Sequence, residues 1–305
     1  MKILIVGATG FLGNYIVNTA GPTGHDVVAT YLFKDVKPPS SNVKYVMLDK
    51  TNTEMISKVF YECSPDVIID ASLIGQVDFI EKNMFRTRAV NVYGTFDLIK
   101  KADEIGSKFI FVSTDFVFDG FKGAEYIETD VTSPLNEYGS QKVVVENYLS
   151  KMYSKYNIVR TSVLYGWNSI NDVPVPREYF ITKLLATLKR GEVFKAITGQ
   201  YEKPTYAKSV AEQIVKLCEE PINGIFHVAG ATCTDRYGHA RATAKVYEFS
   251  EKLVVPCSAN DFTFTAKRPV STCLNTEKAE KFLNYKPLTL EEGLDLMRIE
   301  KDAQI

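Results

Sequence analysis

The sequence predicts an α/β protein with a doubly wound parallel sheet and a smaller, mixed lobe at the carboxyl end. Short apolar runs, typical of strands buried in a parallel sheet, alternate with amphipathic stretches of helical length through the first half of the chain. Such alternation is characteristic of parallel sheets with helices on both faces. We therefore assign residues 1–165 mainly to the core, to which later segments return, and residues 166–305 mainly to the lobe.

The predicted elements follow from these periodicities and from the glycines and prolines that punctuate them. Strands are expected at residues 2–6, 26–33, 43–48, 67–70, 108–112, 158–161 and 224–229. Helices are expected at residues 11–20, 52–63, 77–106, 177–190, 206–219, 235–250 and 290–302. Thr289 and Glu292 form a predicted capping box at the start of the last helix.

The turn after the first strand predicts a dinucleotide site. Residues 7–13 read G-A-T-G-F-L-G, which is G-x-x-G-x-x-G between a strand and an amphipathic helix. Glycines permit a tight turn and the close approach of a pyrophosphate, and the N-terminus of the helix offers N–H groups to its oxygens. A tight turn without a ligand is the alternative, but the context favours a Rossmann-like, dinucleotide-binding core. The expected contacts are Gly7, Thr9, Gly10, Phe11, Leu12 and Gly13.

The end of the second strand predicts which dinucleotide is bound. A basic side chain there accommodates the 2′-phosphate of NADP, and an acidic one binds the 2′-hydroxyl of NAD. Lys34 precedes Asp35 in this chain, so we predict NADP and leave NAD open. Other cofactor contacts are predicted from the ends of later strands and from the 77–106 helix: Asp49, Ala71, Ser72 and Asn91.

A tyrosine and a lysine four residues apart, Tyr138 and Lys142, predict a proton-transfer pair. On a helix they share one face, and the ammonium favours the phenolate, which lowers the tyrosine pKa from about 10 toward neutrality. Thr114 follows the strand at residues 108–112 and could hold the reacting oxygen. In isolation an exposed helix face explains this spacing better, but the glycine-rich turn favours the catalytic interpretation.

Composition and charge argue against several classes of function. A net charge of −1 over 305 residues argues against a nucleic-acid or membrane-surface partner recognised by bulk charge. No apolar run reaches membrane-spanning length, and the amino end resembles a buried strand rather than a signal peptide. Five widely spaced cysteines without a C-x-x-C pair predict reduced thiols in the cytoplasm. Three scattered histidines, His25, His227 and His239, predict no metal site.

Several motifs resemble the extended short-chain dehydrogenase/reductase superfamily. They are G-A-T-G-F-L-G, N-V-Y-G-T, S-T-D-F-V-F-D-G at residues 113–120 and S-P-L-N-E-Y-G-S-Q-K at residues 133–142. R-T-S-V-L-Y-G, G-Q-Y-E-K-P-T-Y-A and R-P-V-S-T-C-L-N-T-E-K are more narrowly similar to the dTDP-4-dehydrorhamnose reductases and the related regulatory subunit of methionine adenosyltransferase. The resemblance covers most of the chain.

The resemblance implies an NAD(P)-dependent oxidoreductase with Thr114, Tyr138 and Lys142 as its catalytic residues. In that family the tyrosine protonates a carbonyl oxygen as hydride arrives from the nicotinamide, and the lysine also binds the nicotinamide ribose. The hydroxyls of Thr114 and Tyr138 would hold the carbonyl oxygen from two sides.

The chain departs from the reductase pattern on the substrate side. Phe116 stands where the reductases usually have Tyr, Val163 where they have Trp, and Gly75 where they have Thr. Three changes around one expected cleft favour a diverged substrate over ordinary core packing. The predicted substrate-binding residues are Asp115, Phe116, Val163 and Arg268, and a salt bridge is an equal alternative for Arg268.

Two functions of different classes follow. The first is an NADP-dependent reductase of a 4-keto nucleotide sugar, with an epimerase or dehydratase of another nucleotide sugar as a variant. The second is a non-catalytic, NADP-binding regulatory subunit like that of methionine adenosyltransferase. The expected partner of the enzyme is a small nucleotide sugar, in the cytoplasm, and a homodimer is left open.

Overall fold

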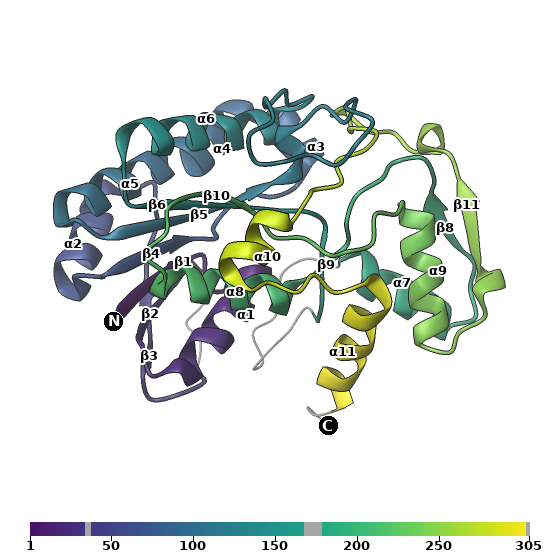
Figure 1. Ribbon diagram of the computed structural model, residues 1–305, viewed down its shortest axis with the longest axis horizontal. Coiled ribbons are helices and arrows are strands. Elements are labelled where there is room, and N and C mark those ends of the chain that lie inside the picture. The colour runs from purple at the N-terminus through teal and green to yellow at the C-terminus, as the bar shows by residue number, and fades with distance from the viewer. Residues whose placement is uncertain (34–37, 168–178, 303–305) are drawn as a thin grey trace.

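Seven parallel strands form the central sheet, in the order β10-β6-β5-β4-β1-β2-β3 (Figure 1). The computed structural model describes residues 1–33, 38–167 and 179–302. The strands are β1 (Lys2–Val6), β2 (Asp26–Tyr31), β3 (Val43–Met47), β4 (Val67–Asp70), β5 (Lys108–Thr114), β6 (Tyr156–Thr161) and β10 (Gly224–His227). Because the chain winds outward from β1 in both directions, the predicted doubly wound fold is confirmed.

Helices cover both faces of this sheet (Figure 1). On one face the core is formed with α2 (Thr53–Cys63), α5 (Gly94–Ile105) and α6 (Glu137–Met152). On the other it is formed with α1 (Phe11–Ala20), α8 (Ala207–Glu219) and α10 (Glu277–Leu283). Late segments therefore return to the sheet: β10, α8 and α10 all belong to it although they follow residue 200. The division into residues 1–165 and 166–305 stays a prediction.

The long helix predicted at residues 77–106 is wrong as a single element. It is divided into α3 (Val77–Lys82), α4 (Met84–Arg88), the π-helix η2 (Ala89–Tyr93) and α5. Asn83 interrupts the first two helices with a ψ of 43°, and its side-chain amide donates to the Phe79 carbonyl at 2.9 Å. Such local side-chain bonds compete with the helical ladder, which explains the break.

The other predicted boundaries differ mostly by one or two residues, although α9 (Arg236–Val246) ends well before residue 250. Glu248, with a φ of +60°, ends that helix in the left-handed region. The described part of the 177–190 helix is α7 (Phe180–Lys189), and the last helix is α11 (Leu290–Asp302). Its capping box is confirmed, because Thr289 N donates to Glu292 at 2.8 Å and Glu292 N donates to the Thr289 hydroxyl at 3.3 Å.

The sequence did not predict the small elements beside the sheet. Two further pairs of parallel strands are β8 (Phe194–Ile197) with β11 (Val254–Cys257), and β7 (Leu164–Tyr165) with β9 (Thr205–Tyr206). Short 3₁₀ turns are η1 (Gly21–Thr23), η3 (Asp115–Val117), η4 (Glu251–Leu253) and η5 (Ala259–Asp261). Figure 1 shows β8, β11, α7 and α9 beyond the edge of the sheet opposite the N-terminus, where they form a separate small core.

The prediction that all five cysteines are reduced is wrong for two of them. Cys233 and Cys273 form a disulfide, with their Cα atoms 5.8 Å apart. The bridge joins two backbone segments that both pair with residues 201–202. Thr234 exchanges two backbone hydrogen bonds with Glu202, and the N–H of Thr272, next to Cys273, donates to the Tyr201 carbonyl. The fold brings these segments together, and the widely spaced cysteines gave no sign of it. The remaining thiols, on Cys63, Cys218 and Cys257, are free.

We expect Cys273→Ser to lower the free energy of unfolding by roughly 4 kcal/mol, because the bridge closes a loop of 40 residues in the unfolded chain. Denaturant unfolding of the oxidised protein, with and without dithiothreitol, measures this difference. Cys257→Ser is the matched control, since it removes a free thiol and should keep the full response to reductant. A parent protein whose unfolding ignores reductant would show that the two thiols are not bridged.

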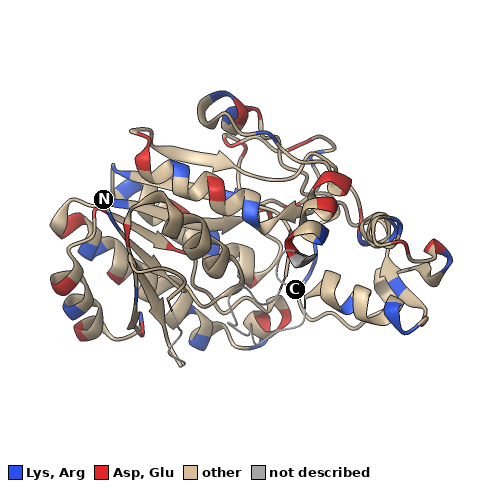
Figure 2. Ribbon diagram, turned by 90° about the horizontal axis from the view of Figure 1, so that it is seen from below, with Lys and Arg blue, Asp and Glu red and all other residues tan. Residues whose placement is uncertain are grey.

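Charged residues are distributed without a dominant sign. Figure 2 shows lysine and arginine interspersed with aspartate and glutamate over the helices and loops of the described chain, which agrees with the net charge of −1. Among the described residues, no helix combines the length and apolar character that crossing a membrane requires.

Candidate functional site

The candidate site lies at the carboxyl edge of the sheet. Gly7 follows β1, Asp70 ends β4 and Thr114 ends β5, and these three strands are neighbours. In open parallel sheets this edge is where ligands bind. The chain thus brings the predicted phosphate loop and the predicted catalytic threonine to the same edge.

The glycine-rich turn has the geometry of a phosphate cradle. Gly7 has a φ of +81°, and a Cβ there would lie 2.6 Å from the Cα of Ser72. A Cβ on Gly13 would lie 2.1 Å from the Gly7 carbonyl oxygen, so only glycine lets α1 pack so closely on the turn. Gly10 is the N-cap residue of α1 and, having no side chain, makes no capping hydrogen bond to it. These residues fit a dinucleotide pyrophosphate, which would take up the uncapped N–H groups.

The other predicted cofactor residues lie in different settings. Thr9, Ala71 and Ser72 are half-buried at turns of the carboxyl edge, whereas Phe11 and Leu12 are buried, with Phe11 stacked on Tyr179 at 4.3 Å between ring centroids. Asp49 accepts hydrogen bonds from the N–H and hydroxyl of Thr51 at 2.8 and 2.7 Å. Lys34 lies outside the described residues.

Asn91 ties two parts of the site together. Its carboxamide oxygen accepts from Ile74 N at 2.9 Å, and its NH₂ group donates to the Gln141 side chain on α6 at 2.9 Å and to Ile74 O at 3.2 Å. This side chain is buried and fixes the loop after β4 against α6.

Thr114 is held by its neighbour Asp115. Its hydroxyl donates to Asp115 Oδ1 at 3.0 Å and accepts from Phe116 N at 3.2 Å. The other carboxylate oxygen of Asp115 accepts from the hydroxyls of Ser162 at 2.8 Å and Thr272 at 2.7 Å. Burial raises the pKa of Asp115, although these three hydroxyls oppose the shift by bonding to the charged form. The Asp115 carboxylate is therefore buried and fully engaged by hydroxyl groups, and it orients the hydroxyl of Thr114.

Tyr138 lies in the first turn of α6, beside the end of β5. Asn136 caps this helix by accepting from Gly139 N at 3.0 Å. A Cβ on Gly139 would lie 2.1 Å from the Phe116 carbonyl oxygen, so this glycine lets α6 approach the Thr114 loop directly. The rings of Phe116 and Tyr138 meet edge to face, with centroids 5.9 Å apart.

Lys142 lies one turn further along α6, against β5. Its Nζ donates to Val112 O at 2.7 Å and lies 4.5 Å from the centroid of the Phe111 ring. Burial lowers the pKa of Lys142 to about 8. The structure thus places Lys142 and the first turn of α6, which carries Tyr138, against the end of β5, where Thr114 lies. Their catalytic roles stay a prediction.

A buried ion pair on the same helix, between Glu146 and Arg160, was not predicted. Glu146 binds the guanidinium of Arg160, with Nη2 to Oε2 at 2.6 Å, and also accepts from the Ser113 hydroxyl at 2.5 Å. The four-residue spacing from Lys142 places Glu146 on the same helix face, which was the one available signal. The pair fixes α6 to β5 and β6, one turn of the helix beyond Lys142.

The predicted substrate residues divide into two groups. Phe116 and Val163 are half-buried rather than core residues, so they can contribute to the wall of a cleft. Arg268 forms the alternative salt bridge: its Nη2 lies 2.8 Å from Asp78 Oδ2, and its guanidinium lies 5.0 Å from the centre of the Phe264 ring.

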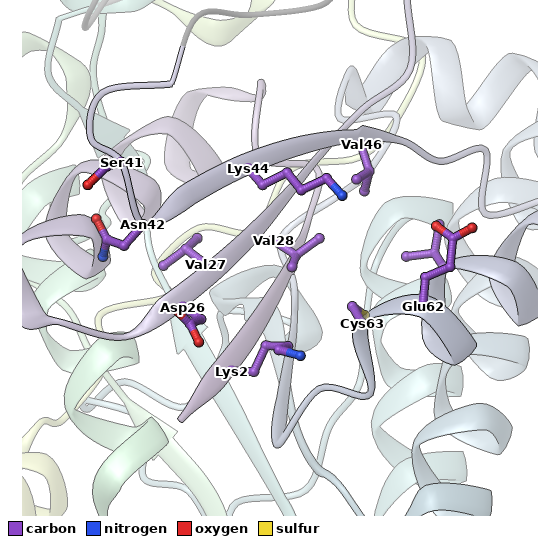
Figure 3. A pocket seen from close by; sticks show the side chains of 11 residues that line it. Lys2, Asp26, Val27, Val28, Ser41, Asn42, Lys44, Val46, Glu62 and Cys63 are labelled. Carbon is purple, nitrogen blue, oxygen red and sulfur yellow. The ribbon is translucent and has the colours of Figure 1, made fainter.

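A hollow of about 290 Å³ lies at the opposite, amino edge of the sheet (Figure 3). Its walls come from the starts of β1 and β2, the residues around β3, and α2: Lys2, Asp26, Val27, Val28, Ser41, Asn42, Lys44, Val46, Val59, Glu62 and Cys63. Burial raises the pKa of the Cys63 thiol to about 11, which makes it a poor nucleophile. The hollow is remote from Thr114, and we assign it no role in the chemistry.

Comparison with known proteins agrees with this geometry. Residues 1–301 match the family described as RmlD substrate binding domain. The chain belongs to that family. Its similarity to a dTDP-4-dehydrorhamnose reductase of Aggregatibacter actinomycetemcomitans is 29% identity, over 97% of this chain and 98% of that protein. The resemblance to the reductase subgroup is therefore confirmed.

Solved structures of the RmlD type share the fold. A dTDP-4-dehydrorhamnose reductase ortholog from Clostridium acetobutylicum has a TM-score of 0.85 and 26% identity, covering 99% of this chain and 100% of that one. A dTDP-4-dehydrorhamnose reductase from Bacillus anthracis, in complex with NADP, has a TM-score of 0.85 and 25% identity, covering 98% of this chain and 99% of that one.

Proposed function

We propose that this RmlD-family protein is an NADP-dependent reductase of a 4-keto nucleotide sugar, similar to dTDP-4-dehydrorhamnose. The observation that carries the proposal is the meeting of α6 with the end of β5, where Tyr138, Lys142 and Thr114 lie at the same sheet edge as the glycine-rich turn. Relatives named dTDP-4-dehydrorhamnose reductase, aligned over nearly the full chain, support it.

In this proposal the chain's own residues hold the substrate oxygen and supply its proton. The nicotinamide, when bound, supplies the hydride. Thr114 and Tyr138 hold the carbonyl oxygen, and Tyr138 donates its phenolic proton as negative charge develops there. Lys142 stabilises the resulting phenolate and binds the nicotinamide ribose, and Gly7, Gly10 and Gly13 admit the pyrophosphate.

The proposal extends to the cofactor preference and to the substrate contacts. The NADP complex of the Bacillus anthracis reductase supports NADP, and Lys34 is the proposed partner of the 2′-phosphate. Phe116 is the proposed substrate-side position, because its ring lies against Tyr138. Val163 is proposed with it, while Asp115 and Arg268 are already engaged by Thr114 and Asp78 and are weaker candidates for direct contact.

A regulatory role without catalysis is the second candidate. It is favoured by the substitutions at Gly75, Phe116 and Val163, which remove polar or aromatic groups that the reductases usually carry. In that case the fold would bind NADP and a protein partner such as methionine adenosyltransferase.

The loss of NADPH absorbance against a panel of 4-keto nucleotide sugars, with dTDP-4-dehydrorhamnose among them, tests the proposal. We expect turnover of at least one sugar and faster oxidation of NADPH than of NADH. If no sugar is reduced and the protein captures methionine adenosyltransferase in a pull-down, the reductase hypothesis is wrong and the regulatory hypothesis takes its place. Reduction of a sugar without a dTDP carrier would keep the reaction and change the substrate.

A further inference from the structure

A buried ion pair lies at the carboxyl end of β4, beside the proposed cofactor site. The Lys50 ammonium and the Asp70 carboxylate are 3.2 Å apart, and their side chains are 5% and 0% exposed. The Thr95 hydroxyl accepts from Lys50 at 3.0 Å and donates to Asp70 at 2.8 Å. Taking two charges out of water costs several kcal/mol per ion, so a buried pair is weak evidence for stability. The hydrogen bonds around the pair indicate a role other than stability.

The pair fixes the turn that follows β4. The second carboxylate oxygen of Asp70 accepts from the N–H of Ser72 at 3.0 Å and from the Ser72 hydroxyl, and Lys50 donates to Ser72 O at 3.2 Å. Ser72 is also the residue that a Cβ on Gly7 would strike, at 2.6 Å. The pair therefore holds the backbone against which the glycine-rich turn packs.

The same carboxylate faces the part of the sheet where Lys142 is buried. Asp70 is opposite Phe111 in the β4–β5 register, and the Lys142 Nζ lies 4.5 Å from the centroid of that ring. Side chains two apart on a strand share a face, and Ile68 packs in the same core cluster as Phe111. Asp70 therefore projects toward the face covered by α6, which carries Lys142.

Three charged groups act on the Lys142 ammonium, and their signs differ. Burial lowers the pKa of Lys142 to about 8; Asp70 opposes that shift, Lys50 adds to it, and Glu146 opposes it more weakly. Glu146 is already bound by Arg160 through both carboxylate oxygens. Of the two carboxylates, Asp70 is thus the one that more strongly opposes the lowering of the Lys142 pKa.

We propose that Asp70, held by Lys50, is a positioning residue of the hydride-transfer site, which fixes the Ser72 turn against Gly7 and places a negative charge on the face of the sheet where the Lys142 ammonium is buried. The importance of this charge for catalysis rests on the proposed function, because there the ammonium stabilises the Tyr138 phenolate. The ionisation of Lys142 itself is a property of the free protein and can be measured without cofactor or substrate.

The test follows the titration of Lys142 by NMR in protein labelled with ¹⁵N-lysine, with the signal assigned by its absence in Lys142→Met. We expect a midpoint of about 8 in the parent protein. Asp70→Asn should lower that midpoint by about one pH unit or more, because it removes an opposite charge and leaves Lys50 unopposed. Lys50→Met should raise it. Opposite shifts are the expected signature, and shifts in one direction, or none, would overturn the proposal.

Either single variant leaves a buried charge without its partner and could fail to fold. The double variant Asp70→Asn/Lys50→Met leaves no such charge, and its midpoint should lie below that of the parent because the loss of Asp70 outweighs the loss of Lys50. A midpoint equal to or above the parent value would overturn the proposal. The affinity of the parent protein for NADPH is measured separately, by fluorescence. If the two single variants shift the Lys142 midpoint in opposite directions but the protein binds no NADPH, the role of Asp70 toward Lys142 stands and the proposed reductase function is refuted.

Discussion

Tyr138→Phe is expected to lower turnover of the 4-keto nucleotide sugar by about 10²- to 10⁴-fold, the range that general acid catalysis contributes. Phenylalanine keeps the ring that packs edge to face on Phe116 at 5.9 Å, so the wall of the site should stay in place. It removes the hydroxyl that the proposal places on the developing alkoxide. Steady-state turnover and a parallel titration with NADPH measure the two effects, and cofactor affinity should survive while the rate falls.

Tyr153→Phe is the matched control. Tyr153 caps the other end of α6, where its hydroxyl donates to Ser107 O, and losing that bond should cost about 0.5–1.5 kcal/mol of stability without slowing turnover. An active enzyme whose rate ignored Tyr138→Phe would refute the acid role. A regulatory protein would have no turnover to lose, and its partner affinity would be indifferent to the change.

The parts of the site that the sequence predicted are those fixed by local backbone geometry. Gly7 and Gly13 are required where the turn has a positive φ and where α1 touches the turn, and both requirements lie within seven residues of each other. Tyr138 and Lys142 share a face of one helix for the same local reason. Pattern and position along the chain were therefore enough to predict the tight glycine-rich turn before α1 and the shared helix face of Tyr138 and Lys142.

The parts that it did not predict depend on partners brought together by the fold. Lys50 meets Asp70 across two strands, and nothing in either neighbourhood identifies the other. The Cys233–Cys273 disulfide spans 40 residues, and its cysteines have no paired spacing. Long-range contacts of this kind leave no periodic signal in the chain.

Arg268 shows how the fold decides between two alternatives that a sequence leaves equal. A guanidinium near the expected cleft could bind a phosphate or an acidic neighbour, and its chemistry is the same in both cases. The structure places Asp78 within 2.8 Å, from a helix 190 residues earlier in the chain. A phosphate would have to compete with that carboxylate, so Arg268 is better explained as a tie between α3 and the segment that follows η5.

Lys142→Met is expected to damage both binding and rate. Methionine fills a similar volume but removes the ammonium that bonds Val112 O at 2.7 Å and that the proposal places against the nicotinamide ribose. Loss of a hydrogen bond to a charged group, worth about 1.5–3 kcal/mol, should weaken NADPH binding by roughly 10- to 140-fold. Turnover at saturating NADPH should fall by a further 10²- to 10⁴-fold, because the phenolate of Tyr138 loses its cation.

Lys108→Met is the control that separates this role from the general cost of removing a partly buried lysine. Lys108 begins the strand that ends near Lys142, and its Nζ donates to the carbonyl oxygens of Leu217 at 2.6 Å and Glu220 at 2.7 Å, at the amino edge of the sheet. Its loss should lower the free energy of unfolding but leave NADPH affinity and turnover unchanged. Equal effects of the two substitutions on NADPH affinity would mean that Lys142 acts through stability alone; a drop confined to Lys142→Met would place its ammonium at the cofactor.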